Sequence, residues 1–174
     1  MLTAPRRERG LCGPGRGSVA ALMLSVSLLQ ACVSSQGVAG PGEPEHALLA
    51  LHEKHLQAHR DGDVDAFLED WADETLSVNR GEMTVARRED MRSAFGSYFG
   101  STRFEYYRDR QPPRAEVSDD GTLGWVAAEV EARGTAVSDD GSETPVEFIS
   151  SWVSLFRNID GEWRLVGNAS SFRE

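Results

Sequence analysis

Hydrophobic side chains in the first half of the chain recur every three or four residues, which is the spacing of amphipathic helices. The pattern predicts a first helix over residues 44–60 and, with Asp63 as its cap, a second helix over 64–71. A brief strand is expected at 75–78, and a third amphipathic helix follows over 87–99. The helical part of the chain therefore precedes the main run of predicted strands.

Beyond Gly100 the hydrophobic period changes to two, which predicts β-strands. Turn sequences that end in Asp-Gly occur at 118–121, 138–141 and 158–161, and long alternating segments lie between them. The last strand is expected over 163–172. Helices followed by an antiparallel meander predict an α+β fold, in which three N-terminal helices pack on one face of an antiparallel sheet.

Residues 1–31 have the layout of a secretion signal. Four arginines precede an apolar run of 11 residues at 19–29. A helix that crosses a bilayer needs about 20 apolar residues, so this run is too short for a permanent transmembrane anchor. Cys12 lies before the run and would be removed together with the signal.

The apolar run ends in Leu29-Gln30-Ala31-Cys32, which resembles the bacterial lipobox. The resemblance implies that Cys32 becomes the first residue of the mature protein and carries the lipid that anchors it in a membrane. The alternative is an ordinary signal peptide followed by an incidental cysteine. Val33 stands where an Asp retains lipoproteins at the inner membrane, so we expect an outer-membrane anchor facing the periplasm if the organism has two membranes.

The rest of the chain divides into a tether and one domain. Residues 32–43 are small, polar and rich in glycine, which predicts a flexible tether, and 44–174 are long enough for one packed core. The full chain carries a net charge of −10, and removal of residues 1–31, with four Arg and one Glu, leaves −13. This acidity argues against nucleic acid as a partner, because phosphate binding needs a basic surface.

Three segments carry a resemblance to the nuclear transport factor 2-like superfamily, which includes ketosteroid isomerases and SnoaL-like polyketide cyclases. They are 59–65 after the first helix, 71–74 before the short strand, and the closing segment 160–166. The resemblance covers residues 45–172. It implies a curved sheet that forms, with the helices, a conical cavity for a small apolar ligand, and it implies sheet faces that pair into a homodimer. No cofactor is expected.

The isomerase branch of that superfamily requires a carboxylate base on the short strand after the second helix. In this chain that position falls on Asn79, and the position of the hydroxyl donor on the first helix falls on His55. An amide cannot accept the proton, so isomerase chemistry is disfavoured. Asp73 and Glu74 are interpreted as caps or solvated turn residues.

Three histidines of the first helix, His52, His55 and His59, lie three and four residues apart, a spacing compatible with a metal site. The glutamate of the metalloprotease motif is absent between the last two, and carboxylates would have to complete the site. We therefore expect no metal. His55 and His59 are either candidate catalytic groups or surface and partly buried imidazoles.

Glu129 and Glu131 share one strand face with Trp125, while the opposite face of the same strand is apolar. If the Trp125 face lines the cavity, burial raises the pKa of Glu129 and makes it a candidate catalytic acid. If that face points to solvent, both glutamates are ordinary strand charges, which is the usual outcome in a half-exposed sheet.

Aromatic and amide side chains supply the candidate ligand-binding residues. Aromatic rings form suitable walls for an apolar ligand, although such rings more often belong to the core. A neutral amide on the last strand can also face the cavity. The candidates are Trp71, Asn79, Phe95, Tyr98, Phe99, Trp125, Trp152 and Asn168.

These observations leave three functions open. The leading hypothesis is a non-enzymatic lipoprotein that holds a small apolar or amphipathic ligand, or a protein partner, at the membrane. The second is an enzyme of the cyclase, dehydratase or isomerase kind acting on a small hydrophobic substrate, which requires Glu129 or a first-helix histidine inside the cavity. The third is a dimerising domain, and an exposed apolar sheet face would favour it.

Overall fold

A computed structural model describes residues 42–173. All of the described residues belong to one compact unit, which is called the second unit because residues 1–37 lie outside it. The predicted signal at 1–31 and the tether up to residue 41 lie outside the described residues. No helix between residues 42 and 173 has the length and apolar character needed to cross a membrane.

Between residues 42 and 173, three helices form where the helical spacing predicts them. Helix α1 (Glu43–Asp61) has a proline in its first turn and ends where Gly62 adopts a left-handed φ of 67°. Helix α2 (Val64–Leu68) begins at the predicted cap, because the Asp63 carboxylate accepts two backbone N–H groups at 3.0 Å. Helix α3 covers Arg88–Ser101.

The second helix ends at Leu68, earlier than predicted, because the next residues join the sheet. The N–H of Leu165 donates to the carbonyl of Asp70 at 2.8 Å, and Trp71 pairs with Leu165 as the first residue of strand β1 (Trp71–Asn79). Contacts with the last strand of the chain therefore override the local helical pattern here.

In the described part of the chain, seven strands form a single sheet in the order β2-β1-β7-β6-β5-β3, with β4 paired to β5. The strand after the Asn79-Arg80-Gly81 turn was not predicted. The bounds are β1 Trp71–Asn79, β2 Glu82–Arg87, β3 Thr102–Asp109, β4 Arg114–Val117, β5 Leu123–Val137, β6 Glu143–Ile159 and β7 Glu162–Arg173.

The prediction of a purely antiparallel sheet is wrong at one pair. Strands β1 and β7 run parallel, with Leu76 opposite Gly167 and Val78 opposite Ala169, and the sheet is therefore mixed. About 90 residues separate these partners in the sequence, and no local turn signal specifies a pairing of that kind.

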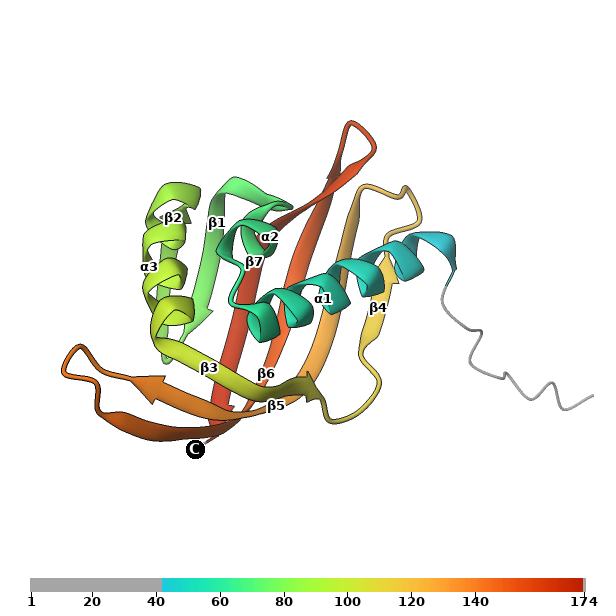
Figure 1. Cartoon of the computed structure of the whole chain (residues 1–174). Helices are drawn as coiled ribbons and strands as arrows, with labels where there is room; N and C mark the ends of the chain where they lie inside the picture. Colours follow the sequence, from blue (N-terminus) through green and yellow to red (C-terminus); the bar gives the residue numbers. More distant parts are fainter. Residues whose placement is uncertain (1–41, 174) are drawn as a thin grey trace, which may run out of the picture. The chain divides into compact units, whose positions relative to one another are not determined.

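All three helices lie on one face of the curved sheet (Figure 1), which we call the inner face. Its core includes Leu48 of α1 together with Val126, Phe156 and Leu165 of the strands, each at most 1% exposed. The opposite side is called the outer face. Because the buried core lies within residues 48–165, the second unit carries its own hydrophobic core, as an independently folding domain does.

Candidate functional site

Two of the first-helix histidines are buried on the inner face, each paired with an aspartate. His52 is 3% exposed, and its Nε2 atom lies 2.9 Å from Oδ1 of Asp109 on β3. His55 is 7% exposed, and its Nε2 atom lies 2.9 Å from Oδ2 of Asp70, just before β1. These pairs connect α1 to two different parts of the sheet.

Asp70 has a second partner, because Nζ of Lys54 lies 3.2 Å from its Oδ1 atom. Burial alone would raise the pKa of Asp70, but the hydrogen bond and charge of His55, together with Lys54, outweigh burial and hold that pKa below its ordinary value. Asp70 is therefore ionised at neutral pH and is fully engaged by its neighbours.

His59 completes the row of histidines but has no acidic partner among residues 42–173. Its Nδ1 atom donates to the carbonyl of His55 at 2.8 Å, and its ring stacks on Tyr107 with centroids 4.3 Å apart. The rings of Phe67 and Phe99 contact its edges. Burial lowers the pKa of His59 to about 4, so this side chain is neutral at physiological pH.

Most of the predicted ligand-wall aromatics come together on the inner face, where they pack on one another. Trp71 and Phe95 have ring centroids 5.9 Å apart, and Phe95 contacts Phe99 at 6.0 Å. Tyr98 contacts Phe99, and Trp152 lies against His52. These rings occupy space between the helices and the sheet, where the family resemblance places a cavity.

The two predicted amides also lie on the inner side of the sheet. Nδ2 of Asn168 donates to Oγ of Ser154 at 3.1 Å. Oδ1 of Asn79 and Nε1 of Trp71 are buried and have no hydrogen-bond partner within the described part of the chain. Within residues 42–173, neither Asn79 nor Asn168 forms a hydrogen bond with the paired histidines.

Trp125 and Glu129 lie on the outer face, because they alternate along β5 with the buried residues Val126 and Val130. Glu129 forms an ion pair with Arg110, and Nε2 of Gln111 donates to its second oxygen at 3.3 Å. The sheet therefore separates Glu129 from the histidines of α1, and these candidate catalytic groups do not converge.

Apolar side chains cross the outer face in two neighbouring rows. The strand registers align Ala127, Val153, Ala169, Val78 and Met83 in the first row, from β5 to β2. Side chains of this row remain accessible, since Val153 and Val78 are each 38% exposed and Met83 is 73% exposed.

The second row consists of Trp125, Leu155, Gly167, Leu76 and Val85. Leu155 is 44% exposed and Val85 is 64% exposed. We call the two rows together the outer apolar surface. This surface was not predicted from the sequence because β2 was not expected, although alternating apolar and polar positions follow the turn at Gly81.

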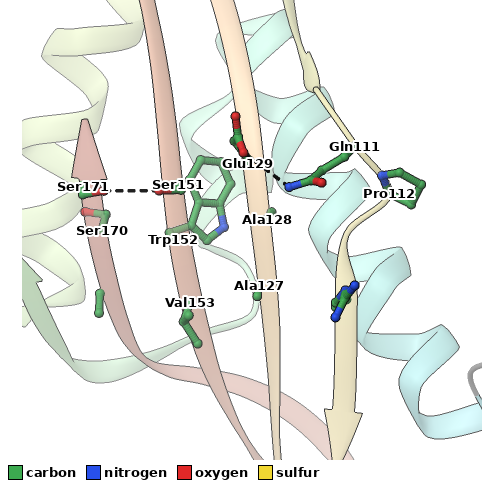
Figure 2. Close-up of a pocket in the computed structure, with 12 residues that line it drawn as sticks. Gln111, Pro112, Ala127, Ala128, Glu129, Ser151, Trp152, Val153, Ser170 and Ser171 are labelled. Atoms are coloured by element: carbon green, nitrogen blue, oxygen red, sulfur yellow. Dashed lines mark hydrogen bonds between the residues drawn. The ribbon is translucent and has the colours of Figure 1, made fainter. Parts of the chain in front are cut away.

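A groove of about 490 Å³ lies on the outer face over β5, β6 and β7. Small apolar side chains form its floor, namely Ala127, Val153 and Ala169. Figure 2 labels Ala127 and Val153 on the neighbouring strands β5 and β6. The hydroxyl groups of Ser151 and Ser171 lie beside this floor and contact each other at 3.2 Å.

One wall of the groove comes from the connection between β3 and β4. Gln111 and Pro112 contribute to this wall, and Arg114 lines the groove from the start of β4. Figure 2 shows Gln111 reaching toward Glu129, so the bonded carboxylate borders the groove. The result is an apolar hollow with a polar rim, which is the usual construction of a small-molecule site.

Metal binding would require several ligating side chains to meet. Within residues 42–173, no group of three or more His, Cys, Asp or Glu side chains is arranged to hold a metal ion. The three histidines instead have separate partners, as described above.

Comparisons with known proteins agree with this architecture. A ketosteroid isomerase-like protein from Erwinia carotovora shares 18% identity at a TM-score of 0.56, over 77% of this chain and 99% of that one. An NTF2-like protein from Cytophaga hutchinsonii shares 16% identity at a TM-score of 0.57, over 72% and 95% of the two chains. A Caulobacter vibrioides protein with a cystatin-like fold shares 17% identity at a TM-score of 0.59, over 76% and 92%.

At these identities the structural neighbours establish only the fold. No functionally curated protein matches the chain in sequence. The model of the SnoaL-like domain matches residues 48–173, which is most of the chain and includes nearly all of the described elements. The protein therefore belongs to the SnoaL-like domain family.

Proposed function

We propose that this protein is a lipid-anchored envelope protein whose SnoaL-like domain binds a small amphipathic ligand in the outer groove without catalysing a reaction. The groove itself is the observation that carries the proposal. Its volume of about 490 Å³ falls within the range of about 300–1,000 Å³ that is typical of small-molecule sites. Its apolar floor and polar rim suit a ligand that has one apolar part and one polar part.

The position of the titratable groups argues against catalysis in this groove. His52 and His55 are buried on the inner face and engaged by aspartates, whereas the groove opens on the outer face. Glu129 does border the groove, but Arg110 and Gln111 engage its carboxylate oxygens. A general base must lie within hydrogen-bonding distance of the substrate proton, and none of the described residues that line the groove is a histidine.

The anchor part of the proposal rests on Cys32 and the segment before it. The arginines, the short apolar run and the small residue before the cysteine together resemble a lipoprotein signal. A lipid on Cys32 followed by a glycine-rich tether would hold the domain close to a membrane, where amphipathic molecules are concentrated.

Native mass spectrometry of a fragment comprising residues 38–174, purified from a bacterial host, tests the binding function. We expect a retained small molecule at one-to-one stoichiometry, released when the protein is denatured. The substitution Ala169→Phe fills the groove and should abolish retention, whereas Val85→Phe, on β2 outside the groove, should not. Retention that survives Ala169→Phe in a folded protein would refute the outer groove as the site.

The outer apolar surface favours a second function, the pairing of two copies of the chain. Met83 and Val85 are 73% and 64% exposed, and contiguous apolar surface of this kind is typical of protein interfaces. Analytical ultracentrifugation of the same fragment tests this possibility. A dimer that the double substitution Met83→Glu and Val85→Glu converts to a monomer would support pairing through β2, and a wild-type monomer at high micromolar concentration would exclude it.

A further inference from the structure

The charges around the groove are largely neutralised by their neighbours. Glu129 pairs with Arg110, and Glu131 accepts from Nη2 of Arg108 at 2.8 Å while also facing Arg110 at 3.9 Å. Two arginines and two glutamates therefore form one network of zero net charge on the outer face, beside β3 and β5. The arginines offset the negative charge of both carboxylates in this network.

Arg114 differs from the other arginines near the groove. It lines the groove, it is exposed, and its guanidinium has no hydrogen-bond or ion-pair partner within residues 42–173. Glu116 lies on the same face of β4, but it does not line the groove and forms no ion pair with Arg114. The groove therefore carries one unpaired positive charge.

The strand register places this charge at the end of the apolar floor. Arg114 pairs with Ala127, Ala127 pairs with Val153, and Val153 pairs with Ala169, so the guanidinium and the floor share one row of the outer face. Small side chains along this row leave the hollow into which an extended apolar group fits. Ser151 and Ser171 offer hydroxyl groups along one side of the row.

From this arrangement we propose that the groove binds an amphipathic monocarboxylate, whose acid group pairs with Arg114 and whose hydrocarbon part lies over Ala127, Val153 and Ala169. A guanidinium presents two parallel N–H groups that match the two oxygens of a carboxylate. The inference deepens the proposed binding function and depends on it, because it names the chemical class of ligand that the same groove takes.

Octanoate is a suitable probe, and octanamide is a neutral control of nearly the same shape. Titration of each compound into the 38–174 fragment, followed by methyl NMR, reports binding through the methyl groups of the floor. We expect octanoate to shift the methyl signals of Ala127, Val153 and Ala169 and to bind at least about tenfold more tightly than octanamide.

Arg114→Gln removes the charge and should weaken octanoate binding about tenfold or more while leaving octanamide binding unchanged. Arg157→Gln is the matched control, since it makes the same change on β6 outside the groove and should leave both affinities unchanged. Circular dichroism of each variant checks that the fold is retained.

The outcomes separate this inference from the proposed function. Equal binding of octanoate and octanamide at the floor methyls, or no effect of Arg114→Gln, would overturn carboxylate recognition and leave the groove as a binding site. Shifts confined to inner-face methyls, or no binding of either compound, would overturn both proposals. A preference for octanoate that Arg114→Gln abolishes and Arg157→Gln does not would support both.

Discussion

The histidine without an acidic partner should make the domain sensitive to mild acid. Burial lowers the pKa of His59 to about 4 in the folded protein, whereas the ordinary value of 6.5 applies after unfolding. The unfolded chain therefore takes up a proton first as the pH falls. The stability that the neutral ring provides is complete above about pH 6.5 and is lost progressively as the pH falls toward 4.

The size of this effect follows from the difference between the two pKa values. One pKa unit corresponds to about 1.4 kcal/mol, so below pH 4 the full shift lowers the unfolding free energy by about 3 kcal/mol. Between pH 7 and pH 5 the same two pKa values predict that the unfolding free energy falls by about 2 kcal/mol. Part of the His59 side chain reaches solvent even though Phe67, Phe99 and Tyr107 enclose its ring, so these figures are upper bounds.

Urea unfolding of the wild-type protein and of His59→Phe at pH 7 and pH 5 measures this effect. The substitution keeps an aromatic ring against Tyr107 and removes the titrating group, so the variant should lose about 2 kcal/mol less unfolding free energy than the wild type over this interval. His46→Phe, at an exposed position of the same helix, is the control and should behave as the wild type. If His59→Phe and the wild type lose the same free energy, burial of His59 is not a source of acid sensitivity.

Three further outcomes are expected. Asp70→Ala leaves His55 and Lys54 without their buried acceptor and should lower the unfolding free energy by about 3 kcal/mol, measured by urea titration at pH 7; a loss below about 1 kcal/mol would contradict the assigned pair. Gly134→Ala should cost about 2–3 kcal/mol in the same assay, because the new Cβ would lie 2.2 Å from a backbone oxygen of β3, and an unchanged midpoint would argue against this close approach. Cys32→Ser should release the otherwise folded protein from the membrane fraction, and a variant that still sediments fully with membranes would refute the lipid anchor.

The local pattern of the chain predicted most elements of the fold correctly. Caps and turns depend on residues that are close together in the sequence, so they could be predicted. Asp63 caps α2 as expected, and the Asp-Gly sequences form turns in which Gly121, Gly141 and Gly161 are left-handed. The α+β class and the superfamily resemblance are confirmed. The end of α2 and the strand β2 were missed, because pairing within the sheet, rather than local spacing, determines both.

The candidate site was predictable only in part. Spacing on α1 indicated that His52, His55 and His59 share one side of the helix, and the structure places all three on the inner face. Their partners were not predictable, since Asp109 lies 57 residues beyond His52 in the chain. The groove as a whole was not predicted, because its wall comes from the connection before Arg114, whose sequence carries no motif. Two of the candidate site residues, Glu129 and Trp152, nevertheless line it.

The sequence alone determined the helical and extended segments, the turn positions, the acidity of the chain and the alternation of faces along β5. Only the tertiary structure decided which face of β5 the helices cover, that β1 runs parallel to β7, and that Arg114 stands in one row with Ala127, Val153 and Ala169. The physical reason is that a period of two assigns residues to common faces but does not identify the buried face. That choice depends on packing between segments far apart in the chain, which determines both the core and the surface left open for a ligand.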